Sequence, residues 1–178
     1  YYKRELKDAS GGILPISFCI PPTSLPFLTK GRDYIPKKTA ILAPCDPRFR
    51  ESYTFQSQSS YYKQYACSLF AVTTKKGGWD CMRHYEILAN HCVPYFPNIL
   101  SKPSSTMHSY PVDLQIEANR LYESFAIGEM ALREDFWYNY TRILHGFMSY
   151  FYSECISTAY ANIVLGAHDS RGLGFFRE

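Results

Sequence analysis

The fold is decided by one stretch of the sequence, Ser68–Phe96, which reads SLFAVTTKKGGWDCMRHYEILANHCVPYF. The short apolar runs at its two ends, SLFAVTT and CVPYF, are typical of buried strands. Between them lies a basic turn that contains two glycines, followed by a segment with helical spacing. This spacing predicts a helix over Asp80–Asn90, with Asp80 as its N-cap. A strand, a helix and another strand with short connections form the repeating unit of a right-handed parallel sheet.

The same order of elements extends toward the N-terminus. Residues 39–44, TAILAP, form a compact apolar run that ends in proline and predicts another buried strand. The polar, tyrosine-rich residues 57–66 predict a surface helix. We therefore expect an α/β fold with a Rossmann-like parallel sheet flanked by helices. After a loop at residues 100–111, helical apolar spacing over residues 112–125, 134–150 and 153–165 predicts a helical C-terminal segment.

A proline-rich segment marks the expected domain boundary. The chain has 178 residues, of which 46% are hydrophobic and 20% charged, and this composition is typical of one folded domain. We expect residues 1–36 to be the end of a preceding domain and its proline-rich linker. Residues 37–178 are then the Rossmann-like domain with its C-terminal helices. Because the sequence starts at Tyr1 and not at Met, we also expect that a preceding N-terminal domain is missing from this chain.

Composition argues against several classes of function. A net charge of only +3 disfavours a nucleic-acid-binding protein that relies on a large basic surface. The six cysteines show no spacing typical of a zinc site, and buried thiols are the default interpretation. No apolar run reaches 18 residues, and no segment has the features of a signal peptide. The aromatic fraction of 17% favours aromatic packing over a surface that contacts sugars.

The turn between the strand and the helix combines flexibility with positive charge. Gly77 and Gly78 permit positive φ angles and the close approach of a ligand to the backbone, and Lys75 and Lys76 precede them. The N-terminus of the following helix carries about half a positive charge. Together, these features predict a phosphate-binding site.

Two charged residues on the helix extend this prediction. Arg83 lies on the first turn, and Glu86 lies three residues further on, on the same side of the helix. Glu86 is then about 9 Å along the axis from the N-cap, roughly the reach from a terminal phosphate to the ribose of a nucleoside diphosphate. A carboxylate there can accept hydrogen bonds from both ribose hydroxyls. The alternative is a plain turn followed by a solvated Arg83–Glu86 ion pair, and the spacing alone leaves both interpretations open.

Three other features permit two interpretations each. Arg48 and Arg50 follow a predicted strand end, and they either approach the ligand or lie on the surface. His84 either touches phosphate, or is exposed or supports neighbouring residues, and the second interpretation is favoured. The run FWYNY at residues 136–140 favours packing within a helix over a platform for sugars.

The residues around the turn resemble the donor-binding segment of exostosin-like glycosyltransferases of the GT-B type. The family pattern is a strand, a Gly-x-x-x-x-x-Arg-x-x-Glu helix start, a small-residue turn and a C-[IV]-P strand. Here this pattern falls on Gly77, Arg83, Glu86 and Cys92–Pro94, and His91 stands where the family has a small residue. The resemblance is specific over residues 73–98. It is weaker for YYKREL and LPISF near the N-terminus and for ISTAYANIVL near the C-terminus.

The resemblance implies a two-domain enzyme of which this chain is the C-terminal, nucleotide-sugar-binding half. Such an enzyme transfers a sugar from a UDP- or GDP-sugar to a glycan or glycoprotein acceptor, without a cofactor or metal ion. It implies that Arg83 is catalytic, because it neutralises the departing diphosphate, and that Glu86 holds the ribose. The other donor-binding residues that it implies are Thr73, Thr74, Lys76, Gly77, Gly78 and Trp79.

Three classes of function remain open. The first is the glycosyltransferase, and the second is a non-catalytic, glycosyltransferase-like structural subunit of a larger assembly. The third is a nucleic-acid-binding module, which the low net charge disfavours, so we expect no nucleic-acid partner. The residues do not determine the compartment, and the resemblance suggests the lumen of the Golgi or another secretory membrane, or a viral glycosylation system.

Overall fold

The chain is built around a parallel sheet of three strands in the order β3–β4–β5. These strands are β3 at Ala40–Leu42, β4 at Ser68–Val72 and β5 at Val93–Tyr95. Helix α1, Gln58–Ala66, connects β3 to β4, and helix α2, Met82–Ala89, connects β4 to β5. The α/β fold with a parallel sheet that the sequence predicts is therefore confirmed. The structure is a computed structural model, and it describes residues 2–5, 13–27, 30–128, 133–159 and 161–162.

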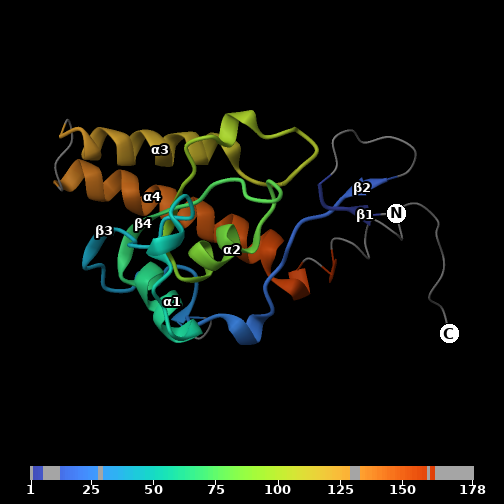
Figure 1. The fold of residues 1–178 in the computed structure, drawn as a ribbon, viewed down its shortest axis with the longest axis horizontal. Coiled ribbons are helices and arrows are strands. Elements are labelled where there is room, and N and C mark those ends of the chain that lie inside the picture. Colours follow the sequence, from blue (N-terminus) through green and yellow to red (C-terminus); the bar gives the residue numbers. More distant parts are fainter. Residues whose placement is uncertain (1, 6–12, 28–29, 129–132, 160, 163–178) are drawn as a thin grey trace.

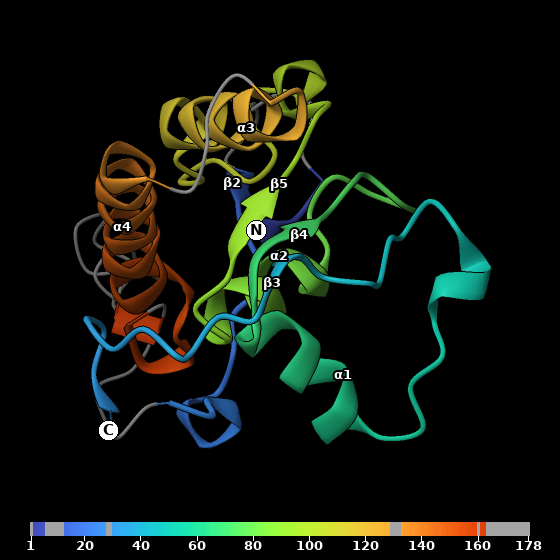
Figure 2. The same cartoon turned by 90° about the vertical axis from the view of Figure 1, so that its left-hand side faces the viewer.

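Helices cover both faces of this sheet (Figures 1 and 2). Helices α1 and α2 lie on one side, and α3, Val112–Ala126, packs beside α4, Glu134–Tyr150, on the other. All five residues of β4 are buried because this strand is central and covered on both faces. Strand β3, which the sequence also predicts to be buried, lies at the edge of the sheet, and its residues are half-buried or exposed. Phe70 contacts the aromatic rings of α3 and α4, whereas Ala71 packs with Ile87 on the other face.

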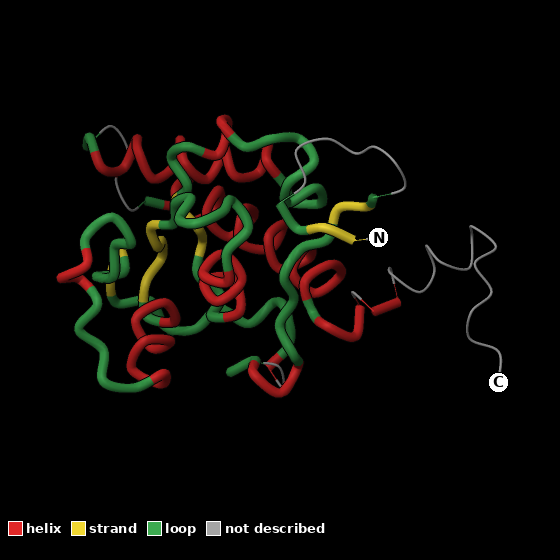
Figure 3. Tube along the Cα trace, turned by 45° about the vertical axis from the view of Figure 1, so that its right-hand side comes forward, coloured by secondary structure: helices red, strands yellow, loops and turns green. Residues whose placement is uncertain are grey.

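The segment before β3 also packs against the domain. Strand β1, Tyr2–Lys3, pairs in parallel with β2, Leu14–Pro15, and Figure 3 shows this small sheet near the N-terminus, apart from the central one. Ile20 forms a bridge with Ile156, and its side chain belongs to the main hydrophobic core. The expected domain boundary at residue 36 stays a prediction.

The C-terminal helices differ in detail from the prediction. Helix α4 continues into a π-helical turn at Phe151–Cys155, whereas the sequence predicts a separate helix from Ser153. Residues 157–159 and 161–162 are helical, and the remainder of that predicted helix lies outside the described residues. Within the FWYNY run, Phe136 and Tyr140 are buried as expected, but Trp137 and Tyr138 are exposed.

All six cysteines are unpaired. Three of them are buried, in agreement with the default interpretation of the sequence, and the others are half-buried: Cys19, Cys67 and Cys81.

Candidate anion-binding site

The candidate site lies in the loops that follow β3 and β4. In an open parallel sheet, ligands bind outside the carboxyl ends of the strands, where such loops converge. Here the two loops, with helices α1 and α2, bring together five side chains: Tyr53, Tyr61, Lys76, Arg83 and Glu86.

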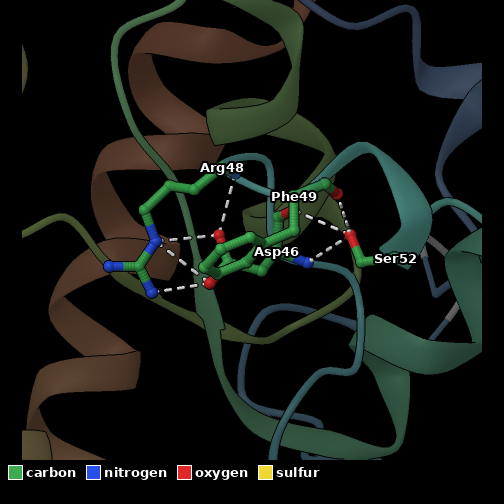
Figure 4. A network of polar contacts seen from close by, with 4 residues as sticks. All are labelled: Asp46, Arg48, Phe49 and Ser52. Carbon is green, nitrogen blue, oxygen red and sulfur yellow. Dashed lines mark hydrogen bonds and ion pairs between the residues drawn. The ribbon is translucent and has the colours of Figure 1, made fainter.

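The loop after β3 is held by a compact polar network (Figure 4). The Asp46 carboxylate accepts hydrogen bonds from Arg48, at 2.9 Å from the backbone nitrogen and 2.6 Å from Nη2. The Asp46 backbone nitrogen donates to the Ser52 hydroxyl at 3.0 Å, and this hydroxyl lies 2.7 Å from the Phe49 carbonyl. The network therefore fixes the turn directly before Tyr53. It also engages Arg48 in an ion pair, and Arg50 is exposed.

The loop after β4 is held by a buried histidine. His84 Nε2 lies 2.7 Å from the carbonyl oxygen of Trp79, and Nδ1 lies 2.8 Å from the hydroxyl of Thr73. Because a carbonyl can only accept, Nε2 carries the hydrogen and Nδ1 accepts from Thr73. Burial lowers the pKa of His84 to about 4, so the ring is neutral at pH 7. His84 thus supports the loop. The favoured interpretation of the sequence was a histidine that is exposed or supports neighbouring residues, and His84 does the second, because it is buried.

The predicted helix start is wrong. Helix α2 begins at Met82, and the N-cap is Cys81 instead of Asp80. The Asp80 carboxylate accepts a hydrogen bond from the Tyr85 hydroxyl at 2.7 Å and another from the Phe18 backbone nitrogen at 3.0 Å. The carboxylate that the sequence predicts to cap the helix N-terminus therefore accepts hydrogen bonds from these two donors instead. The N-terminus of α2 consequently has no side-chain cap.

The glycine pair does not act as predicted. Neither Gly77 nor Gly78 has a positive φ. Gly78 instead permits close approach of the Glu5 carboxylate, because a Cβ at Gly78 would lie 2.5 Å from Glu5 Oε1. The same oxygen accepts a hydrogen bond from the Asp80 backbone nitrogen at 2.7 Å. A carboxylate therefore occupies this loop, whereas Gly77 is exposed and has open space around it.

Arg83 is half-buried and incompletely hydrogen-bonded. Its Nη2 donates to the Tyr53 hydroxyl, and its Cζ lies 5.7 Å from the centre of the Tyr53 ring. Its Nε and Nη1 are buried and have no hydrogen-bond partner among the described residues. Within this part of the chain, the ion pairs are formed by other residues, so Arg83 does not form the ion pair with Glu86 that the sequence leaves open.

Glu86 points toward α1. Its Oε2 accepts from the Tyr61 hydroxyl at 3.3 Å, and its Oε1 accepts from the Tyr62 hydroxyl at 3.5 Å. Burial raises the pKa of Glu86 above its usual value, and the tyrosine hydrogen bonds and Arg83 oppose this shift. Each carboxylate oxygen can accept two hydrogen bonds, and each accepts only one of these long bonds, so each retains capacity to accept another.

A cavity of about 370 Å³ adjoins these groups and is within the size range of small-molecule sites, roughly 300–1,000 Å³. Two of the lining residues contact the charged side chains: Tyr53 contacts Arg83, and Tyr61 contacts Glu86. The lining residues are Tyr53, Phe55, Ser57, Gln58 and Tyr61.

The other residues that the resemblance implies lie in different surroundings. Thr73 is fully buried beneath His84, and Thr74 is half-buried. Trp79 is buried in the core, with its ring centre 6.2 Å from that of Phe96. Lys76 is exposed, and its Nζ lies 5.9 Å from the centre of the Tyr53 ring. The structure thus brings together Lys76, Arg83 and Glu86, but it places Thr73 and Trp79 in structural roles.

The tyrosines of this site were not found from the sequence. Tyr53 lies in a predicted loop, and Tyr61 and Tyr62 lie in the predicted surface helix; YYKQYACS, residues 61–68, precedes the segment that resembles the donor-binding region, but no site role is assigned to these tyrosines. The local density of tyrosines was the available signal, but it does not indicate which rings face α2.

In the part of the chain that the structure describes, no group of three His, Cys, Asp or Glu side chains is arranged to hold a metal ion. None of the described helices is long and apolar enough to cross a membrane. No protein-family model, curated protein or solved structure significantly matches this chain.

Proposed function

We propose that this chain is the donor-binding half of a GT-B glycosyltransferase and that Arg83 binds the diphosphate of a nucleotide sugar. The observation that supports this proposal is the guanidinium of Arg83, which has two buried nitrogens without partners in the described structure. Leaving buried donors unpaired is unfavourable, and a guanidinium fits two phosphate oxygens in a fixed fork. Each fork contains Nη2 together with Nε or Nη1, so a diphosphate that replaces the Tyr53 hydroxyl on Nη2 would also give one of the two unpaired nitrogens a partner.

The surroundings of Arg83 fit the same ligand. Lys76 adds a second positive charge at the same tyrosine ring. The loop after β4 already holds an anionic group, the carboxylate of Glu5, on the backbone nitrogen of Asp80. A negatively charged oxygen is therefore compatible with this loop. Phosphate oxygens, like the oxygens of this carboxylate, need hydrogen-bond donors.

The remaining parts of a nucleotide have matching neighbours. Glu86 has the capacity to accept hydrogen bonds from ribose hydroxyls. The cavity beside it is walled by tyrosine and phenylalanine rings, with Ser57 and Gln58 as polar groups, which suits a planar base.

The assignment to sugar transfer rests on the motif of Gly77, Arg83, Glu86 and Cys92–Pro94. In this proposal, Arg83 stabilises the negative charge that grows on the departing diphosphate, and a glycan or glycoprotein acceptor is bound by another part of the enzyme. The second candidate is a non-catalytic structural subunit with the same fold. The absence of a positive φ at the glycine pair favours it, because the loop lacks one feature expected of a phosphate cradle.

Calorimetric titration of UDP, GDP and pyrophosphate into the purified chain separates the two candidates. We expect saturable binding, and we expect Arg83→Met to weaken it at least tenfold, since charge-assisted hydrogen bonds contribute roughly 1.5–3 kcal/mol each. Arg83→Lys should also weaken binding, because lysine keeps the charge but loses the fork.

Arg142→Met is the matched control. Arg142 is exposed on α4, on the opposite side of the sheet, and is paired with Glu117. This variant should bind like the parent. Absence of saturable binding in the parent would support the structural subunit, and equal effects of the Arg83 and Arg142 variants would exclude Arg83 from the site.

A further inference from the structure

Tyr53 contacts both positive charges of the candidate site. The Arg83 Cζ lies 5.7 Å from the centre of its ring, and the Lys76 Nζ lies 5.9 Å from it. Both distances are within the range of about 6 Å in which an aromatic face attracts a cation. The two cations come from different elements, Lys76 from the loop after β4 and Arg83 from α2. Tyr53 is therefore a contact that they share.

This arrangement opposes the repulsion between the two cations. Lysine and arginine charges that converge without a counter-ion repel each other, and the electron-rich face of a tyrosine ring attracts both. The segment that carries the ring is also held in place. It directly follows the network of Asp46 and Ser52, and its neighbour Phe55 packs against Tyr61 at a ring distance of 5.6 Å.

The Tyr53 hydroxyl occupies one donor position of Arg83. Nη2 donates to this hydroxyl, whereas Nε and Nη1 are shielded from solvent and have no partner within the described ranges. An incoming anion must therefore take the place of a covering group to reach the guanidinium. Tyr53 is 38% exposed, so its side chain has space to move outward.

We infer that Tyr53 is the positioning residue of the anion site: its ring gathers Lys76 and Arg83, and its hydroxyl is replaced on Arg83 by a ligand oxygen. The exchange breaks one hydrogen bond, from Nη2 to the hydroxyl, and forms another, from Nη2 to the diphosphate. This inference rests on the proposed function, because it takes a diphosphate as the ligand.

Two variants separate the ring from the hydroxyl, with inorganic pyrophosphate as the probe in calorimetric titrations. Tyr53→Phe keeps the ring and removes the hydroxyl that competes with the ligand, so pyrophosphate should bind as tightly as in the parent or up to several-fold more tightly. Tyr53→Leu removes the ring, and binding should weaken about fivefold through the loss of the two cation–π contacts.

A double-mutant cycle with Lys76→Met provides a readout that a merely structural role would not change. If the ring positions Lys76, then Lys76→Met should weaken pyrophosphate binding less in the Tyr53→Leu background than in the parent. Tyr138→Leu is the matched control, because Tyr138 is an exposed tyrosine on α4, on the opposite side of the sheet. It should leave pyrophosphate binding unchanged.

The possible results distinguish this inference from the proposed function. No binding of pyrophosphate to the parent would contradict the proposed function and the inference together. Binding that depends on Arg83 but is unchanged in Tyr53→Leu would contradict only the role of the ring. Weaker binding in Tyr53→Phe would contradict the exchange of the hydroxyl, and this variant decides the question even if Tyr53→Leu fails to fold.

Discussion

Two polar clusters that contain buried groups differ in how completely their groups are paired. The first joins α3 to the exit of β5 and consists of Tyr110, Gln115 and Asn119 around the backbone of Phe96. The second is the cluster around Arg83. The first cluster is extensively hydrogen-bonded, whereas the second leaves two buried nitrogens of Arg83 without partners among the residues described.

The first cluster has a clear structural role. The Asn119 side chain pairs with both backbone groups of Phe96, accepting from the nitrogen at 3.0 Å and donating to the carbonyl oxygen at 2.8 Å. Gln115 donates to the Pro94 carbonyl at 2.7 Å and to Asn119 Oδ1 at 2.9 Å, and it accepts from the Tyr110 hydroxyl at 2.6 Å. A cluster that satisfies itself specifies the fold, whereas one that does not has capacity for a ligand.

The largest expected effect comes from breaking the satisfied cluster. Asn119→Leu leaves the Phe96 backbone nitrogen and one donor of Gln115 unpaired in the interior, and it removes one of the two hydrogen bonds to the Phe96 carbonyl, which also accepts from the Ile99 nitrogen. It should lower the free energy of unfolding by about 3–5 kcal/mol. Arg83→Met removes donors that are already unpaired, together with one hydrogen bond and one cation–π contact. It should change the free energy of unfolding by at most about 1 kcal/mol.

Urea denaturation of both variants tests this contrast. Similar losses in the two variants would show that the Arg83 cluster is also structural, and the comparison between the clusters would then fail.

The second effect is a dependence of stability on pH that originates at His84. Its pKa is lowered to about 4 in the folded state by burial, whereas the unfolded chain has a usual value near 6.5. The unfolded state thus binds more protons between these values. The free energy of unfolding should fall as the pH is lowered from about 6.5 to 4, by up to about 3 kcal/mol.

Denaturation curves across this pH range measure the effect. His84→Gln keeps a polar side chain at the position but removes the titrating group, so its stability should depend less on pH there. An equally steep fall in the variant would assign the dependence to other groups.

The smallest effect concerns Glu5, whose carboxylate lies on the loop that the proposal assigns to the diphosphate. Glu5→Gln removes a negative charge that repels the ligand, and it should tighten pyrophosphate binding about two- to fivefold, the scale of partly exposed charge interactions. The effect should decrease with added salt. Calorimetric titration measures it, with Glu134→Gln, an exposed carboxylate on α4, as the control. Equal affinities for the parent and Glu5→Gln would place the diphosphate away from this loop.

Local sequence patterns were sufficient for the main elements of the fold. The apolar runs at residues 39–44, 68–74 and 92–96 contain the three strands of the sheet. A strand that is covered on both faces needs consecutive apolar residues, and β4 is such a strand, whereas β3 is half-buried to exposed at the edge of the sheet. The helix at residues 57–66 was predicted from its polar, tyrosine-rich composition and the helix after the basic turn from its spacing. The short connections predicted the parallel arrangement of the strands. The bounds were less accurate, since helix ends depend on groups outside the helix.

Capping and glycine conformation were mispredicted for a common reason. Asp80 has the chemistry of an N-cap, but its carboxylate accepts a hydrogen bond from the backbone nitrogen of Phe18, 62 residues away. Gly78 has the freedom to adopt a positive φ, but the Glu5 side chain is what requires a small residue there. In both cases a distant segment provides the stronger interaction.

The sequence by itself determined the parallel α/β fold, the position of the basic turn and the placement of Arg83 and Glu86 on one helix. Only the tertiary structure decided which groups surround these two side chains. Tyr53 lies 30 residues from Arg83, and Tyr61 lies 25 residues from Glu86. Periodicity and propensity describe neighbours along the chain, whereas the pairing of a buried charge depends on segments that only the packing of the sheet and helices brings together.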